Sequence, residues 1–141
     1  MNPYAHSADQ YLAQRVLGAS PEQQAALLME AGQLFLGKAI RAMEQRDYSQ
    51  LARHLGQVAK IINEAVLRVN REDGGELVQN LLKIYAWWTS ELFEASNTKD
   101  AAKLRVLSHH MGQIRQAWEQ LHEKHVKASS APGFDLRAQV V

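Results

Sequence analysis

Cysteine is absent from this chain of 141 residues, and its absence removes several classes of site at once. Without thiols there can be no disulfide framework, no thiolate nucleophile and no thiolate metal centre. Haem attachment through a Cys-x-x-Cys-His motif is excluded for the same reason. A chain without cysteine is also suited to a reducing compartment.

A strong charge of one sign and a long apolar run are lacking as well. Sixteen Lys and Arg residues oppose fifteen Asp and Glu residues, so the formal net charge is +1. Such a balance creates no general field for nucleic acid or for an acidic membrane surface. No segment approaches the roughly 18 apolar residues of a membrane span, and the N-terminus lacks the basic and apolar regions of a secretory signal. We therefore expect a cytoplasmic protein that neither inserts into a membrane nor binds nucleic acid.

Proline is scarce, and none of the three prolines interrupts four long amphipathic stretches. Each stretch follows a short segment with a capping-type side chain and, three positions later, an acidic or amide residue. These segments begin at Ser20, Asp47, Asp73 and Asn97. The stretches predict helices over residues 21–46, 49–71, 76–97 and 99–126. Four helices of about 25 residues joined by tight turns predict an all-α fold, an antiparallel up-and-down four-helix bundle.

The two ends of the chain differ from these four stretches. Residues 1–19 have the apolar spacing of a short amphipathic helix, which is too short to be stable alone. They are expected to form a helical leader, and together with the bundle they make one domain over residues 1–126. Residues 127–141 contain turn and linker chemistry and predict a disordered tail.

Helical periodicity separates core positions from apolar residues that lie elsewhere. The positions predicted to face the core include Leu28, Phe35, Leu77, Ile84 and Trp88. In the stretch 49–71 the predicted core stripe is Leu51, Leu55, Val58, Ile62, Ala65, Val66 and Val69. Trp87 falls on the polar side of the same helix as Trp88, about 100° away around the helix axis. The apolar residues outside the core stripes, or widening them beyond the usual arc, are Leu27, Leu34, Ile61, Leu82, Tyr85, Trp87 and Phe93. Isolated exposed apolar residues are common, but several on different helices indicate a surface that binds a protein partner.

One short motif raises the alternative of a metal-binding bundle enzyme. Glu119 and His122 form a Glu-x-x-His unit, and His125 follows one turn later. Di-iron bundles need two such units and two further glutamates, and the sequence contains only this one. Phosphate-binding glycine loops and a nucleophile elbow are also missing from the sequence. We therefore expect no enzymatic activity, no metal and no cofactor.

A series of short motifs along residues 4–122 carries more specific information. Tyr11, Val16 and the segment Ala19–Pro21 open the series, and Arg115–Trp118 closes it. Its middle part is Gly75–Leu81, with the sequence GELVQNL, followed by Ile84 and Tyr85. In this order and spacing the motifs resemble those of the flagellin-specific flagellar export chaperones, the FliS family.

The resemblance implies a cytoplasmic chaperone that binds the C-terminal segment of newly made flagellin. Such a chaperone prevents premature polymerisation and assists delivery of the subunit to the flagellar export apparatus, with components of the export gate as further partners. The family's leader can occupy part of the binding surface, which adds Tyr4, Tyr11 and Leu12 to the candidate partner-binding residues. The alternative is a helical adaptor or regulator of flagellar gene expression that binds another protein.

Overall fold

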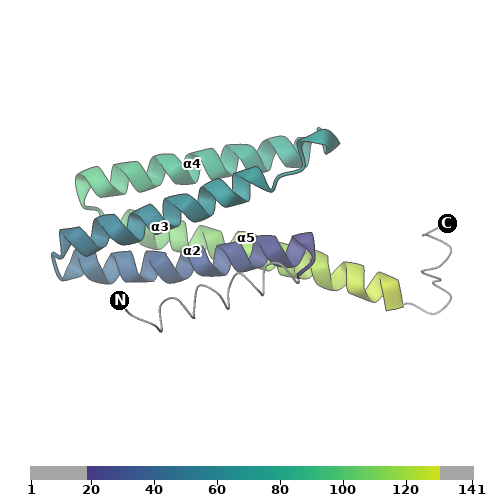
Figure 1. Cartoon of the computed structure of the whole chain (residues 1–141), viewed down its shortest axis with the longest axis horizontal. Coiled ribbons are helices and arrows are strands. Elements are labelled where there is room, and N and C mark those ends of the chain that lie inside the picture. The colour runs from purple at the N-terminus through teal and green to yellow at the C-terminus, as the bar shows by residue number, and fades with distance from the viewer. Residues whose placement is uncertain (1–18, 131–141) are drawn as a thin grey trace. The chain divides into compact units, whose positions relative to one another are not determined.

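The computed structural model describes residues 19–130, and every regular element within them is helical (Figure 1). None of these helices is long and apolar enough to cross a membrane. The elements are α2 (Pro21–Glu44), α3 (Tyr48–Leu67), the short 3-10 helix η1 (Arg71–Asp73), α4 (Glu76–Thr98) and α5 (Ala101–Ser130). The predicted all-α fold is confirmed, whereas the first 18 residues of the predicted leader and the tail beyond residue 130 lie outside the described residues.

Two of the four predicted helix starts have the expected capping chemistry. At the start of α2, the Ser20 hydroxyl oxygen accepts a hydrogen bond from the Gln23 backbone N–H at 3.2 Å. The Gln23 side-chain oxygen accepts in return from the Ser20 N–H at 3.0 Å, so the pair forms a capping box. At the start of α3, the Asp47 carboxylate accepts from the Gln50 N–H at 3.2 Å. Local side-chain chemistry therefore decides where these two helices begin.

The other two starts correct the prediction. The residue before α4 is Gly75, which has no side-chain cap, and Asp73 instead ends η1. Asn97 continues α4, which ends where Lys99 adopts a left-handed conformation with φ of 56°. Asp100 then caps α5, because its carboxylate accepts from the backbone N–H of Ala102 at 3.0 Å. The third and fourth signals lie near helix boundaries but do not mark the capping residues.

The ends of α3 and α5 differ most from the prediction. The helix expected over residues 49–71 ends at Leu67, and η1 takes up the residues that follow it after a short turn. Conversely, α5 continues through Ser130, four residues beyond the predicted end at 126 and into the predicted tail. Residues 127–130 carry no proline or glycine, the residues that most strongly stop a helix.

The described residues belong to two compact units, and α2 and α5 contribute to both. Residues up to Leu27 and from Arg115 onward form one unit, and Leu28–Ile114 form the other. In the first unit, the Ser20 hydroxyl lies 3.0 Å from Nδ1 of His122. This contact ties the start of α2 to the last third of α5.

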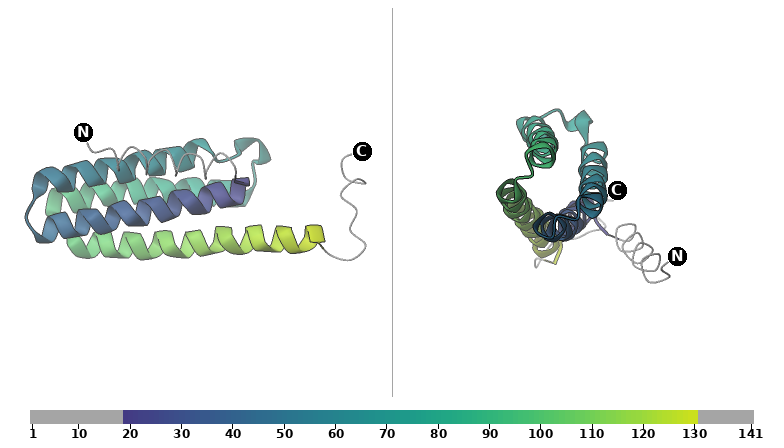
Figure 2. Two further views of the ribbon diagram at one scale, coloured as in Figure 1. Left: turned by 60° about the horizontal axis from the view of Figure 1, so that its bottom comes forward. Right: turned by 90° about the vertical axis from the view of Figure 1, so that its left-hand side faces the viewer.

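The unit of residues 28–114 is an antiparallel bundle of four helices. The chain reverses at each short connection, and Figure 2 shows η1 joining the end of α3 to the start of α4. The side-chain amide of Gln33 on α2 donates to the Ser108 carbonyl oxygen on α5 at 3.0 Å. Ile61 of α3 lies beside Gly32 of α2, α3 packs along α4, and α4 packs on α5. Each helix thus has two neighbours, as the predicted up-and-down bundle requires.

The buried positions of α3 follow the predicted stripe, but those of α2 and α4 correct it. On α2, Leu36 is fully buried while the predicted Leu28 and Phe35 are half-buried. On α4, Tyr85 is buried and Ile84 is half-buried. The buried residues of α3 and α4 are Leu51, Leu55, Val58, Ile62, Ala65, Leu81, Tyr85, Trp88, Leu92 and Ala95.

The apolar stripe of α4 continues past the end of the packed core. Leu77, predicted to face the core, is 66% exposed in the first turn of α4. Leu67, at the end of α3, has the same exposure. These two residues lie on either side of the η1 connection. Their spacing continues the apolar pattern of their helices, but no described neighbour covers their side chains.

Because α2 packs closely against α5, we expect alanine substitutions at two glycines of α2 to change stability in opposite directions. A Cβ atom at Gly32 would lie 2.8 Å from the Met111 sulfur, whereas Gly37 has no atom within 4 Å of that position. Because Met111 is fully buried, Gly32→Ala should overpack the core at a cost of about 1–3 kcal/mol, which exceeds the helix-propensity gain of about 1 kcal/mol. Gly37→Ala should raise the free energy of unfolding by about 0.5–1 kcal/mol. Urea denaturation measures both, and a gain in stability for Gly32→Ala would contradict the tight crossing.

Candidate functional site

A second stripe runs along α3 and α4, one position after the core stripe of each helix. Its members carry no charge, most are small, and they follow each other at alternating spacings of four and three residues. On α3 they are Ala52, Gly56, Ala59, Asn63 and Val66, and on α4 they are Leu82, Ala86, Thr89, Phe93 and Ser96. This spacing places each stripe along one side of its helix. We call the two together the α3–α4 stripe.

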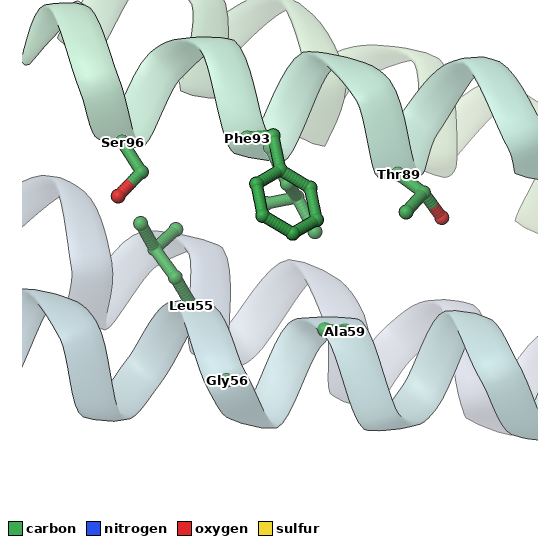
Figure 3. Close-up of a pocket in the computed structure, with 7 residues that line it drawn as sticks. Leu55, Gly56, Ala59, Thr89, Phe93 and Ser96 are labelled. Carbon is green, nitrogen blue, oxygen red and sulfur yellow. The ribbon is translucent and has the colours of Figure 1, made fainter.

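The α3–α4 stripe borders an apolar groove between the two helices. The groove has a volume of about 190 Å³ and is lined by Leu55, Gly56, Ala59, Thr89, Leu92, Phe93 and Ser96. Figure 3 shows Leu55 of α3 and Phe93 of α4 extending into the space between the helices, with the small residues Gly56 and Ala59 along α3. The volume exceeds that of a cavity of about 150 Å³ that holds benzene. The groove therefore has room for a large apolar side chain of a partner.

Phe93 and Gly56 give this groove the properties of a binding surface. Phe93 is 69% exposed, the highest exposure among the large apolar residues of the described chain. Gly56 presents no side chain, so the backbone of another segment can approach α3 closely there. A helix packs best where small residues on one surface receive large residues from the other. The groove can accept an amphipathic helix that buries Phe93 and places an apolar side chain against Leu55.

The other side of α4 is closed by contacts to α5. The indole N–H of Trp88 donates to Nδ1 of His110 at 2.7 Å. Trp87 meets the same imidazole edge-on, with ring centroids 5.5 Å apart. Lys103 of α5 pairs with Glu91 of α4 at 3.2 Å, and this hydrogen bond raises the pKa of the Lys103 ammonium by stabilising its charged form. On the side of α4 that borders the groove, Phe93 is exposed.

The predicted partner-binding residues lie in several different parts of the structure. Phe93 lines the groove, and Leu82 lies half-buried on the same stripe. Trp87 is 45% exposed on the α5 side of α4, where it shares His110 with Trp88 although the two tryptophans point in different directions. Leu34 is exposed on α2. The structure thus brings only Phe93 and Leu82 to the groove region among these residues.

Tyr85, one of the predicted partner-binding residues, does not lie on the surface. Its side chain is 2% exposed and packs on Trp88 with ring centroids 5.3 Å apart, so it belongs to the core. Ile61 is half-buried on the α2 side of α3, and Leu27 is half-buried in the other compact unit. The remaining predicted residues, Tyr4, Tyr11 and Leu12, lie outside the described residues.

Sequence reasoning missed the residues that make the groove hollow. Gly56, Ala59, Thr89 and Ser96 are small or weakly polar, and such residues carry no hydrophobic signal of their own. The sequence signal that could have revealed them is the absence of charge along both stripes. None of the ten positions, spaced alternately by four and three residues on each helix, carries a charged residue. A surface face of a helix normally carries charged residues.

The side chains considered as metal ligands form hydrogen bonds or ion pairs with other residues of the described chain. Glu119 pairs with Arg115 at 2.9 Å. Nδ1 of His125 lies 3.1 Å from a carboxylate oxygen of Glu22, and His122 contacts Ser20. Within residues 19–130 no three His, Cys, Asp or Glu side chains gather as a metal site.

Comparison with known proteins gives a consistent family match. A family model described as flagellar protein FliS matches residues 4–125. The flagellar secretion chaperone FliSB of Pseudomonas aeruginosa is 29% identical over 105 residues, which cover 74% of this chain and 83% of that protein. The flagellar secretion chaperone FliS of Salmonella typhimurium is 27% identical over 110 residues, 77% of this chain and 82% of the relative. That of Vibrio cholerae is 27% identical over 115 residues, 80% and 83% of the two chains.

Proposed function

This chain belongs to the FliS family of flagellar proteins, and from that premise we propose that it is a cytoplasmic chaperone for flagellin. It binds the C-terminal segment of newly made flagellin, prevents premature polymerisation and assists delivery to the flagellar export apparatus. The relatives in three bacteria are named flagellar secretion chaperones, which supports this role. Its activity is binding, without catalysis.

The observation that carries the proposal is the uncharged groove between α3 and α4. A disordered segment that folds on binding must recover an ordering cost of about 2–5 kcal/mol from its contacts. An amphipathic helix achieves this by laying its apolar face into a hydrophobic groove. Exposed Phe93 and the hollow beside Leu55 offer such a contact on two rigid helices. We assign the flagellin segment to this groove.

We expect a flagellin C-terminal peptide of about 40 residues to bind the full chain with a submicromolar Kd and to gain helix on binding. Burial of the apolar groove and of the peptide's apolar face supplies the affinity, and folding of the peptide gives a negative heat-capacity change. Titration calorimetry at several temperatures measures the Kd and the heat-capacity change, and far-UV circular dichroism measures the helix.

A scrambled peptide of the same composition is the matched control, because it keeps the charge and hydrophobicity and loses the amphipathic spacing. Absence of both heat and added helicity, with the chaperone shown to be folded, would rule out flagellin as the partner.

A further inference from the structure

Two hydroxyl groups line the groove, and they differ in how they are bonded. The Thr89 hydroxyl donates to the carbonyl oxygen of Tyr85, one turn earlier on α4, at 3.1 Å. Ser96 also lines the groove, where it is half-buried, and its hydroxyl has no hydrogen-bond partner among the described residues. Figure 3 shows this hydroxyl extending from α4 into the space between the two helices, on the side of Leu55. The groove thus contains one hydroxyl that is bonded within α4 and one that is not.

The orientation of the Ser96 hydroxyl is not the usual one for this part of α4. Serine and threonine hydroxyls inside a helix can donate to the carbonyl oxygen one turn earlier. Thr89 makes such a bond, and so does Thr98, whose hydroxyl donates to Glu94 at 2.8 Å. Ser96 makes no such bond and keeps both a donor and an acceptor for a group that enters the groove.

A helix bound in the groove would remove water from the Ser96 hydroxyl. A hydroxyl that loses water and gains no partner costs free energy. The backbone N–H and C=O groups of a bound helix are already paired within that helix, so the new partner has to be a side chain. None of the lining residues is charged, and a charged side chain would be buried there without a counter-charge. A neutral amide or hydroxyl side chain is therefore the best match.

We propose that Ser96 is a specificity-determining residue of the groove, which forms a hydrogen bond with a neutral polar side chain of the flagellin segment. This inference rests on the proposed function and specifies the part of the segment that the groove receives. Ser96 follows Phe93 by three residues, about 4.5 Å along α4. A helix that lies along α4 therefore presents an apolar residue beside Leu55 and Phe93, and an Asn, Gln, Ser or Thr three or four residues from it. Such a polar contact fixes the orientation of a ligand in an apolar site.

Removal of single hydroxyls tests this contact. Ser96→Ala in the full chain removes the hydroxyl and leaves the shape of the groove almost unchanged. Ser90→Ala is the matched control, because Ser90 is an exposed serine of the same helix that does not line the groove. Both variants exchange serine for a better helix former, and urea denaturation checks that they are folded. The probes are the C-terminal flagellin peptide and a series of its variants, in which each neutral polar and each apolar residue in turn is replaced by alanine.

We expect Ser96→Ala to bind the natural peptide about tenfold more weakly, because the polar group of the peptide is then buried without its partner. Ser90→Ala should bind within about twofold of the wild type. One polar substitution in the peptide should weaken binding to the wild type about tenfold and have little further effect on Ser96→Ala, which is the coupling that a direct contact gives in a double-mutant cycle. A second cycle with Phe93→Ala should identify an apolar residue of the peptide three or four positions away.

Three outcomes would overturn the inference, and each has a different cause. If Ser96→Ala binds the natural peptide within about twofold of the wild type, the hydroxyl needs no partner in the complex, and flagellin binding stands. If Ser96→Ala and Ser90→Ala weaken binding equally, the effect does not arise in the groove. A folded wild-type chain that binds no peptide would overturn the proposed function together with this inference.

Discussion

Trp88→Ala is expected to lower the free energy of unfolding by about 3–5 kcal/mol, the largest stability loss that we foresee for a single substitution. Trp88 is the largest fully buried side chain of the described residues and packs on Tyr85. Its truncation leaves a cavity between α4 and α5 and removes the hydrogen bond to His110. Urea denaturation followed by circular dichroism measures the loss.

Two further variants separate the causes of this loss. Trp88→Phe keeps most of the buried ring and removes only the N–H donor, so it should cost about 1–2 kcal/mol. Trp87→Ala serves as the matched control, because it removes the neighbouring tryptophan, which is 45% exposed. It should cost about 0.5–1 kcal/mol, the value of its edge-on contact with His110. Equal losses for Trp87→Ala and Trp88→Ala would mean that the rotation of α4 about its axis is wrong.

The sequence predicts well those features that depend on neighbouring residues along the chain. The capping box at Ser20 and the cap at Asp47 need only three or four consecutive residues. The buried stripe of α3 follows because each apolar residue on it has the same spacing. Trp88 could be assigned to the core on the same ground, and its burial confirms that assignment.

Features that depend on how one element ends or crosses another were not predictable in this way. Asn97 and Asp100 both have capping side chains, and the choice between them depends on the left-handed turn at Lys99 that stops α4. The burial of Tyr85 depends on how α4 is rotated about its axis relative to its neighbours. A helical wheel drawn for one helix does not determine this rotation to better than about one residue. From the sequence alone, Gly32 is a residue of low helix propensity that alanine should improve. Only the position of Met111 beside it shows that a larger side chain does not fit.

The groove illustrates the same limit for the candidate site. Phe93 could be singled out from the sequence because a phenylalanine off the core stripe is conspicuous. Gly56 and Ala59 become part of a site only when α3 and α4 lie side by side and leave space above Leu55. A hollow is a property of two surfaces together, so neither helix alone reveals it.

Gly56→Trp is expected to weaken binding of the flagellin peptide by at least about 100-fold, the loss typical of a hot-spot contact. Gly56 lines the groove, and a Cβ atom there would meet no other atom within 4 Å, so a side chain can begin at this position without a clash at Cβ. The indole would occupy the space beside Leu55 and Phe93 that we assign to the peptide. Stability should stay the same or rise by about 0.5 kcal/mol, because tryptophan favours helix more than glycine does. Calorimetry and urea denaturation measure the two quantities.

Gly37→Trp provides the control for this substitution, because Gly37 also has free space around its Cβ position but lies on α2. It changes the composition in the same way and leaves the groove open, so it should bind the peptide within about twofold of the wild type. Gly56→Ala should also retain binding, since a methyl group fills little of a hollow of about 190 Å³. A stable Gly56→Trp variant that binds as tightly as the wild type would move the flagellin site away from this groove. Equal losses in Gly56→Trp and Gly37→Trp would instead indicate that the peptide wraps both faces of the bundle, with no single groove dominating its affinity.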